Sequence, residues 1–317
     1  MCSRENHSRS GFDRDTKNHS GSGFLRAGPG SPLVTSDHVA VRACRLETAT
    51  ALLSIDVETD YGTGRTDALL QVERLLAVLA EHRVPLTAFV EGQLFEQQPG
   101  LCSLLVDHGV DVQLHVYDHA TTGDSPDSLR RGADAYASFM GRSPDGYRAH
   151  MYRLTPALYD ALVALDFKWD SSLMRAFGLG RNGHACYREG DYFVTGTGLI
   201  EFPVGSWRHV PLPLNHPYTL LAGSAGGRIL RALCGQSGRL VAYNMHMTDL
   251  LRSPALAQAP YGRLFRWLQQ WMWLGHGGDT FDALRLMCEY LRRQGFSFET
   301  TTELYRRVTS AAATSRL

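Results

Sequence analysis

The sequence predicts an α/β fold in which a mostly parallel sheet is wrapped by helices. Short apolar runs alternate with amphipathic segments along most of the 317 residues, and several of these runs end in an acid or a histidine. This alternation is typical of parallel strands, because each strand needs a crossover, usually a helix, to reach the next one. Hydrophobic periodicity alone does not distinguish a closed barrel from an open sheet.

The first strand is expected at residues 51–56 (ALLSID), an apolar run that ends in an acid. In residues 66–82, leucines and a valine fall on one stripe with helical spacing, which predicts an amphipathic helix that packs on the sheet. Further strands are expected over residues 85–92, 110–115, 146–150, 167–172, 199–205, 239–246 and 297–300, and further helices over 101–108, 125–141, 155–165, 281–293 and 301–308.

Residues 1–38 are rich in Ser, Gly, Asn and Arg and lack apolar periodicity, so we expect them to form a disordered polar tail. In residues 39–317 we find no internal repeat and no sharp change of composition. The sequence therefore predicts one catalytic domain after the tail.

The chain carries 32 Lys and Arg residues and 32 Asp and Glu residues, so its formal net charge is zero. Proteins that bind nucleic acid usually have a basic excess, so no nucleic-acid binding is expected. The six cysteines are scattered singly, without a C-x-x-C pair. That scatter favours reduced, buried thiols and argues against a zinc site built from cysteine.

The start of the sequence has no apolar segment of the kind found in secretory signals, which leads us to expect a cytoplasmic protein. No run approaches the roughly 18–20 apolar residues that a membrane-spanning helix needs. Residues 220–234 are moderately amphipathic, which indicates packing within the protein or, alternatively, peripheral contact with a membrane surface.

Residues that can carry chemistry follow the expected strands, at the point where each strand ends. Because functional groups collect at the carboxyl ends of strands in parallel α/β folds, we expect these side chains to converge on one rim. They are Asp56 and Glu58 at the end of the first strand, His115 and His119 at the end of the third, Arg148 and His150 at the end of the fourth, Asp170 in the fifth, and His246 at the end of a later strand.

His115 and His119 are four residues apart, which places both imidazoles on one face of a helical turn, as a shared metal requires. Two histidines and one carboxylate leave positions open for water and substrate at a catalytic metal. In a chain with 13 histidines, a chance pair on the surface or in the core is the alternative interpretation.

Asp56 and Glu58 are two residues apart at the end of an apolar run. Two neighbouring carboxylates allow a division of labour, in which one binds a metal and the other acts as a base on water. A pair of solvated acids in a loop or at a helix cap is the alternative interpretation.

Seven segments occur in a specific order, namely SIDVETDYG, VPLTAFVEG, LHVYDH, YRAHMY, WDSS, EFPVG and NMH. Together they cover roughly residues 50–250, and the sequence in this order resembles the polysaccharide deacetylase family (NodB homology, carbohydrate esterase type 4). The closing run FDALRLMCEYLRRQGFSFETTTEL also looks like the final helix–strand–helix of that family. The match is to a divergent branch that has D-x-E or D-x-D in place of adjacent aspartates.

The resemblance implies an irregular (β/α) barrel of the NodB-deacetylase type. Carried over position by position, Asp56 matches the general base and Arg148 matches the arginine that orients it. His246 matches the acid that protonates the leaving amine, and Asp170 matches the aspartate of the fourth motif, which we expect to support His246.

The resemblance also implies one divalent metal ion, usually Zn²⁺, with other divalent transition metals as alternatives. Glu58, His115 and His119 match its ligands, and the glutamate among them departs from the family's usual residue. The metal would polarise the substrate carbonyl and lower the pKa of a water molecule.

The third motif departs most from the family. Where the family has Arg-Pro-Pro-Tyr or Arg-Ala-Pro, this chain has Arg148-Ala149-His150-Met151-Tyr152. By the resemblance, the backbone N–H of Met151 would help to hold the oxyanion, although the prolines that shape the family's loop are absent. His150 and Tyr152 are candidate substrate contacts.

Trp207 and Arg208 follow the strand expected at residues 199–205 and are further candidate contacts with a sugar. An ordinary loop with a packed tryptophan is the alternative. Residues 266–278 contain three tryptophans, which we interpret as core or interface packing rather than as a sugar-binding platform.

The function implied by the resemblance is metal-dependent removal of an acetyl group from an N-acetylated sugar, in the synthesis of a surface glycan or O-antigen. The expected partner is therefore an N-acetylated sugar, a sugar nucleotide or a glycan. Two alternatives stay open. One is an allantoinase-like amide hydrolase on the same scaffold, and the other is a non-catalytic carbohydrate-binding protein that has kept the fold.

Overall fold

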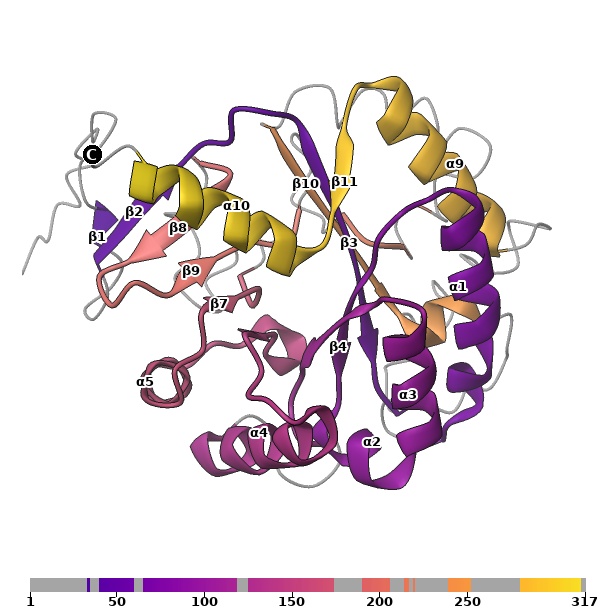
Figure 1. Cartoon of the computed structure of the whole chain (residues 1–317), viewed down its shortest axis with the longest axis horizontal. Coiled ribbons are helices and arrows are strands. Elements are labelled where there is room, and N and C mark those ends of the chain that lie inside the picture. Colours follow the sequence, from indigo (N-terminus) through magenta and orange to yellow (C-terminus); the bar gives the residue numbers. More distant parts are fainter. Residues whose placement is uncertain are drawn as a thin grey trace, which may run out of the picture.

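A largely parallel sheet lies at the centre of the structure, with helices around it (Figure 1). The structure is a computed structural model, and it describes residues 33–34, 40–59, 65–118, 125–173, 190–205, 214–216, 219, 239–251 and 280–314. Its strands are β1 (Leu33–Val34), β2 (Ala40–Cys44), β3 (Thr50–Val57), β4 (Thr87–Val90), β5 (Asp111–Leu114), β6 (Gly146–Tyr147), β7 (Trp169–Asp170), β8 (Tyr192–Thr195), β9 (Ile200–Glu201), β10 (Leu240–His246) and β11 (Ser297–Glu299).

Between the strands lie α-helices and short 3₁₀ segments, in the alternation that the sequence predicts. They are η1 (Asp67–Gln71), α1 (Val72–Glu81), α2 (Gly92–Gln97), α3 (Pro99–Asp107), α4 (Pro126–Met140), η2 (His150–Tyr152), α5 (Pro156–Ala164), η5 (Met247–Leu250), α9 (Thr280–Arg293) and α10 (Thr301–Thr314). Figure 1 shows α1 to α5 and α9 arranged around the strands, and α10 lying across them. Among the described residues, no helix is long and apolar enough to cross a membrane.

The strands follow the order β1-β2-β8-β9-β7-β6-β5-β4-β3-β10, and β11 also pairs with β3. All pairs from β9 through β7, β6, β5, β4 and β3 to β10 are parallel, whereas β1, β2 and β8 form an antiparallel extension. The predicted mostly parallel sheet is therefore confirmed. The antiparallel strands β2 and β8 were not expected from the sequence.

The sheet closes on itself beyond β9. The Gly205 N–H donates to the Ala242 carbonyl of β10 at 2.9 Å, and the Asn244 N–H of β10 donates to the Leu214 carbonyl at 3.3 Å. A side chain at position 205 would bring its Cβ within 2.6 Å of the Ala242 oxygen, so glycine is needed for this close approach. These contacts make the sheet an irregular barrel.

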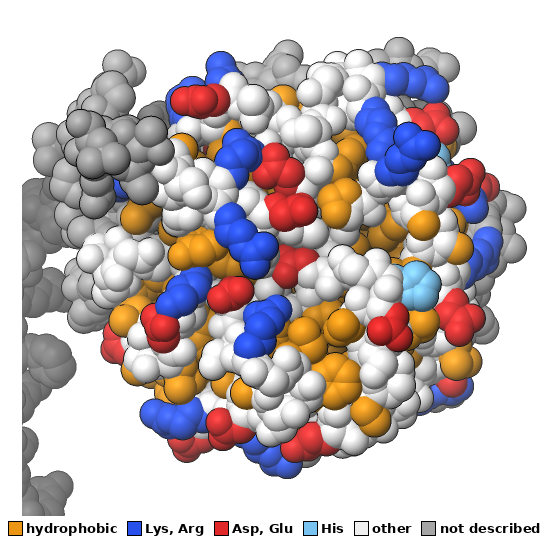
Figure 2. Space-filling model, viewed as in Figure 1, with side chains coloured by type: hydrophobic (Ala, Val, Ile, Leu, Met, Phe, Trp, Pro, Cys, Tyr) orange, Lys and Arg blue, Asp and Glu red, His pale blue; other side chains and the backbone are white. Residues whose placement is uncertain are grey.

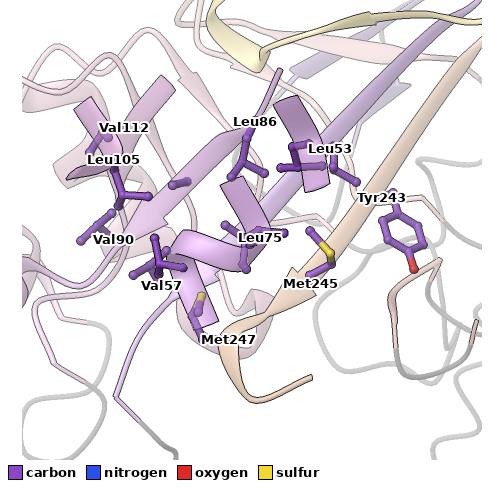
Figure 3. Packing of buried hydrophobic residues seen from close by; sticks show 14 of the residues in the cluster. Leu53, Val57, Leu75, Leu86, Val90, Leu105, Val112, Tyr243, Met245 and Met247 are labelled. Atoms are coloured by element: carbon purple, nitrogen blue, oxygen red, sulfur yellow. The ribbon is translucent and has the colours of Figure 1, made fainter. Parts of the chain in front are cut away.

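Alternate residues of the central strands face opposite sides of the sheet. Those of β3 and β10 that face the helices are apolar, and Figure 3 shows Leu53, Val57 and Met245 in this layer beside Leu75 of α1. Both faces of β3 are buried, as expected for a parallel strand covered on each side. The hydrophobic core therefore lies mainly between the sheet and its surrounding helices.

The interior of the barrel changes from apolar to polar along the strands. A second buried cluster inside the barrel unites Leu52, Phe89, Trp169, Phe202 and other residues with Leu304 of α10, which lies at the amino ends of the strands. Toward the carboxyl ends, the inward positions are polar, with Ser54 and Asp56 in β3 and Asn244 and His246 in β10. The apolar layer closes one end of the barrel, and the polar layer forms the floor of the other end.

Helix α10 is held beneath the strands by polar contacts at its start. The Thr301 N–H donates to Thr87 Oγ1 at 2.8 Å, and the Thr302 N–H donates to the Asp111 carboxylate at 3.1 Å. Thr87 begins β4 and Asp111 begins β5, so the helix is tied to the amino ends of two neighbouring strands.

Most of the predicted tail, residues 1–38, lies outside the described residues. Leu33–Val34 is an exception, because it pairs with β2 as a short strand. Residues 266–278 lie outside the described residues, as does 220–234, the segment considered for membrane contact.

Charged side chains of both signs are interspersed on the face of the molecule seen in Figure 2, where they alternate with apolar groups. This face includes α10, whose start contacts the amino ends of the strands. No large field of one sign is visible there, as the net charge of zero would suggest.

We predict that Gly146→Ala destabilises the protein by about 3 kcal/mol, because overpacking a rigid site forces the backbone or a ring to move. A Cβ at position 146 would lie 2.1 Å from the Trp169 ring, which is itself fully buried. Urea unfolding would measure the change. Gly100→Ala is the matched control, because a Cβ there meets nothing within 4 Å, and it should leave stability unchanged or slightly raised. Equal effects of the two variants would contradict this packing argument.

Candidate active site

The polar end of the barrel brings together residues that are far apart in the sequence. In the ladder between β3 and β10, Asp56 and His246 are direct register partners. His246 Nε2 lies 3.5 Å from Asp56 Oδ2. Both positions face inward because each lies an even number of residues beyond the inward-facing Leu52 and Leu240. The expected convergence of Asp56 and His246 is confirmed.

Arg148 occupies the centre of this polar layer and is fully buried. Its Nη1 donates to Asp56 Oδ1 at 2.7 Å and to Asn244 Oδ1 at 2.6 Å. Its Nη2 donates to Ser171 Oγ at 3.0 Å, and its Nε donates to the Ser171 carbonyl at 3.1 Å. The guanidinium also lies 3.8 Å above the centre of the Phe89 ring. A buried guanidinium is thus supplied with acceptors on every side, as its burial requires.

Asp56 is held as an anion by its surroundings. Burial raises the pKa of this carboxyl group, but the charge of Arg148 and those of His115 and His246 outweigh burial, so the pKa lies below its usual value. Asn244 Nδ2 lies 3.3 Å from Asp56 Oδ2 and adds a further donor. The family resemblance implies that Arg148 orients Asp56, and the contact between them is present in the structure.

His246 lies between two carboxylates. Its backbone N–H donates to Asp249 Oδ2 at 2.7 Å, and its ring Nδ1 lies 3.3 Å from the same oxygen. Burial lowers the pKa of this imidazole, but Asp249 and then Asp56 and Glu58 outweigh that effect and raise the pKa to about 10. His246 is therefore a protonated imidazolium at neutral pH, with 28% of its side chain exposed at the mouth of the barrel.

The expectation that Asp170 supports His246 is wrong, because Asp249 makes that contact. Asp170 instead accepts from Ser172 Oγ at 2.6 Å and from the Ser172 N–H at 3.1 Å. Burial and the charge of Asp170 raise the pKa of Glu201, its buried neighbour, well above the usual value. Glu201 is the register partner of Asp170, because β9 pairs with β7 in the sheet. The order of the strands in the sequence did not indicate that these two acids would be neighbours.

Glu58 and His115 lie side by side at the rim, with His115 Nε2 3.5 Å from Glu58 Oε2. His115 Nδ1 donates to the Arg148 carbonyl at 2.5 Å, which fixes the ring and directs Nε2 toward Glu58. Burial lowers the pKa of His115, but Glu58 and Asp56 raise it to about 9. An oriented imidazole nitrogen beside a carboxylate oxygen fits the donor set that a zinc ion takes.

The third expected ligand, His119, lies outside the described residues, as do Trp207 and Arg208. Among the described residues, no group of three His, Cys, Asp or Glu side chains is arranged to hold a metal. The two described members of the expected ligand set therefore fit a metal, and the third stays a prediction. Glu91 of the loop after β4 is buried nearby and accepts from the Thr59 N–H at 2.9 Å, which holds the loop that carries Glu58.

The third motif forms a tight turn with two residues in the left-handed region. Met151 has φ 50° and Tyr152 has φ 56°. Each such non-glycine residue costs about 1 kcal/mol or more, so the surroundings must hold the turn. The Tyr152 N–H donates to the Ala149 carbonyl and the Arg153 N–H to the His150 carbonyl, both at 3.1 Å, and neither of these turn bonds uses the Met151 N–H.

His150 and Tyr152, the candidate substrate contacts of this motif, lie in different environments. His150 is half-buried, and burial together with the charge of His115 lowers its pKa to about 4, so it is neutral. Tyr152 is buried, and its hydroxyl accepts from Asn244 Nδ2 at 2.6 Å. The Tyr152 hydroxyl therefore takes part in the interior network beneath the rim.

Several residues of this network were not identified from the sequence, among them Ser54, Asn244 and Asp249. Ser54 and Asn244 precede Asp56 and His246 by two residues, so they lie on the same face of their strands. The two-residue period of the strands could therefore have identified Ser54 and Asn244 from the sequence. For Asp249, the signal was its place three residues after His246, where it completes a capping box at the start of η5.

A family model for polysaccharide deacetylases matches residues 60–169. The peptidoglycan deacetylase of Helicobacter pylori is 27% identical to this chain over 124 residues, which cover 38% of this chain and 42% of that protein. The peptidoglycan deacetylase-like protein FGM2 of Gibberella zeae is 30% identical over 122 residues, 36% of each protein. The chain thus spans less than half the length of these two curated relatives.

Among solved structures, the crystal structure of PuuE allantoinase has a TM-score of 0.53 with this chain. The two are 13% identical, and the alignment covers 81% of this chain and 89% of the other. At this identity the likeness shows the fold alone. It agrees with the barrel closure described above, and the expected barrel-like α/β fold is confirmed.

We predict that Arg148→Met lowers the free energy of unfolding at pH 7 by about 3–5 kcal/mol, because it leaves Asp56 as an uncompensated buried charge. The pKa of Asp56 is lowered in the folded protein. Its stabilising contribution is therefore present above the pKa of the unfolded chain and is lost as the pH falls through the folded value. The deficit of the variant should accordingly shrink toward pH 4, where Asp56 can be protonated in the variant.

Urea unfolding of both proteins at pH 7 and pH 4 would test this. Arg130→Met is the matched control, because the Arg130 side chain is 56% exposed and pairs with Asp127 at the surface. A deficit of Arg148→Met that is small, or that does not change with pH, would show that the pairing with Asp56 is not what stabilises the polar layer.

Proposed function

Because this chain belongs to the polysaccharide deacetylase family, we propose that it hydrolyses the acetamide of an N-acetylated sugar with the help of a divalent metal ion. One observation carries the proposal: a carboxylate, Asp56, lies between a buried guanidinium and an imidazolium, beside the pair formed by Glu58 and His115. Base, acid and candidate metal ligands are thus within reach of one small substrate group.

In this proposal, Asp56 takes the proton from the water molecule that attacks the acetyl carbon. Arg148 holds the carboxylate ionised and aimed, because its Nη1 lies 2.7 Å from Asp56 Oδ1. A carboxylate with a lowered pKa is a weak base, so the proton transfer needs an acidic water molecule. A divalent metal ion held by Glu58, His115 and His119 would supply this by lowering the pKa of water and would polarise the acetamide carbonyl.

His246 donates a proton to the sugar nitrogen as the carbon–nitrogen bond breaks. An amine anion is a very poor leaving group, so a positioned acid is needed. Asp249 holds the imidazole from the Nδ1 side, which leaves the proton on Nε2 directed toward Asp56 and the mouth of the barrel.

Charge that develops on the acetyl oxygen needs a donor as well. The Met151 N–H suits this role because neither bond of its turn uses it, and because Met151 lies at the surface of the rim. We propose that this N–H faces the oxyanion. His150, which is neutral and half-buried beside it, is in position to contact the sugar.

The first test combines metal analysis with acetate release. Purified protein would be assayed on chitin oligomers, peptidoglycan fragments and a sugar nucleotide carrying N-acetylglucosamine, with Zn²⁺ as the first metal. We expect about one divalent ion per chain and acetate from at least one substrate. Asp56→Asn should lower kcat by about 10³-fold or more, since it removes the base but not the candidate ligands.

Asp282→Asn is the matched control, because Asp282 lies on α9 and pairs at the surface with Arg285. Turnover of allantoin without acetate release from any sugar would favour the allantoinase-like alternative. Binding of glycans without a metal and without turnover would instead favour the non-catalytic alternative and overturn the proposal.

We predict that Asp249→Asn moves the alkaline limb of the pH profile of kcat to lower pH by about one unit. Asp249 raises the pKa of His246, so the acid form persists to high pH, and activity is lost as the pH rises through that pKa. With the charge removed, the pKa falls and the loss begins earlier. The profile of Asp282→Asn serves as the reference, and an alkaline limb that stays in place would show that Asp249 does not set the protonation of the acid.

A further inference from the structure

The turn that carries Met151 is not held in its left-handed conformation by its own sequence. Met151 and Tyr152 both have positive φ, and neither is glycine. The turn also lacks a proline, so the restraint must come from contacts with the rest of the barrel. The described residues provide such contacts on each side of Met151.

On the near side, the Ala149 N–H donates to Ser172 Oγ at 2.8 Å, and Ser172 Oγ donates in turn to Asp170 Oδ1 at 2.6 Å. Both Ser172 and Asp170 are fully buried. This chain of bonds anchors the start of the turn to the end of β7. It also gives Asp170 a place in the site that differs from the expected one.

On the far side, Asn244 Nδ2 donates to the Tyr152 hydroxyl at 2.6 Å. The ring of Tyr152 is buried, so this bond anchors the end of the turn inside the barrel. Met151 lies between the two anchors, with 49% of its surface exposed. The position of its backbone is therefore set by residues below the rim.

The orientation of the Asn244 amide is fixed by its neighbours. Arg148 has only donors, so the atom 2.6 Å from its Nη1 must be the amide oxygen, which also accepts from Ser54 Oγ at 2.9 Å. The amide nitrogen is then directed to Tyr152 and to Asp56 Oδ2, 3.3 Å away. One fully buried side chain thus contacts the base, the guanidinium beside it and the end of the turn.

We propose that the hydrogen bond between Asn244 and Tyr152 acts as a latch, meaning that it couples the position of Asp56 to that of the Met151 N–H. Asn244 and Tyr152 are then positioning residues for the reaction. The inference rests on the proposed function for its effect on turnover, but the latch itself is a statement about the turn. A proline restrains the backbone of a loop through its ring. Here the hydrogen bond from Asn244 of β10 to the Tyr152 hydroxyl would restrain the backbone of the turn instead.

Tyr152→Phe tests the latch with the smallest change, because only the hydroxyl is lost. We expect kcat on the best N-acetylated substrate to fall about 10-fold while KM changes less than 3-fold, and backbone amides of residues 149–153 to exchange hydrogen at least 10-fold faster. Asn244→Ala should have a larger effect, because Arg148 and Asp56 lose a partner too. In the double variant, Tyr152→Phe should add nothing to Asn244→Ala.

Tyr159→Phe is the matched control. Tyr159 on α5 is also a buried tyrosine, and its hydroxyl lies 2.5 Å from Thr197 Oγ1, away from the site. This variant should leave both kcat and exchange in the turn unchanged. If Tyr152→Phe and Tyr159→Phe lower kcat equally, or if the effects of Tyr152→Phe and Asn244→Ala simply add, the latch is overturned.

Failure of the latch and failure of the proposed function give different results. Hydrogen exchange in the turn does not require turnover, so unchanged exchange in Tyr152→Phe overturns the latch whatever the protein catalyses. Faster exchange in a protein that releases no acetate would support the latch and contradict the deacetylase.

Discussion

The buried guanidinium of Arg148 is the constraint on which the polar end of the barrel depends. It draws acceptors from β3, from β10 and from the segment after β7, and it lies on the ring of Phe89 in β4. A buried charge is tolerated only when its donors are satisfied, so the ends of these strands must keep their register relative to one another. The arrangement of the candidate site follows from that requirement.

Along its axis, the interior of the barrel is divided into an apolar layer and a polar layer that holds the candidate site. In β3 the inward side chains run from Leu52 through Ser54 to Asp56, and in β10 they run from Ala242 through Asn244 to His246. Two residues along a strand therefore change the interior from an apolar layer, which stabilises the fold, to a polar layer that can do chemistry. Both strands change at the same level, because Ser54 and Asn244 are register partners.

Much of this was predictable from the sequence, because long apolar runs and helical stripes reflect burial directly. The central strands and helices match the predicted order, and the convergence of Asp56, Arg148 and His246 follows from the rule that strand ends meet at one rim. Ser54 and Asn244 could also have been found, since a two-residue step from Asp56 and His246 leads to both.

Other features depend on contacts that no local pattern encodes. Glu201 meets Asp170 only because β9 pairs with β7, and strands of two residues leave almost no periodicity. The choice of Asp249 over Asp170 as the partner of His246 depends on the 3₁₀ turn after β10. The left-handed Met151 lies between contacts made by Asn244 of β10 and by Ser172, which follows β7, whereas local propensity would oppose it.

The pairing of β3 bears on how the protein reaches its folded state. Along one edge β3 pairs with β10, and on the other edge its first residues pair with β11 while its last pair with β4. Thr50 can therefore form its strand pairs only with Leu240 and Ser297, which follow it by most of the length of the chain. Such distant pairing slows folding and leaves a strand edge open in the meantime. A nascent chain would therefore present the unpaired backbone groups of β3, together with its apolar side chains, to chaperones or to other copies until the later strands are made.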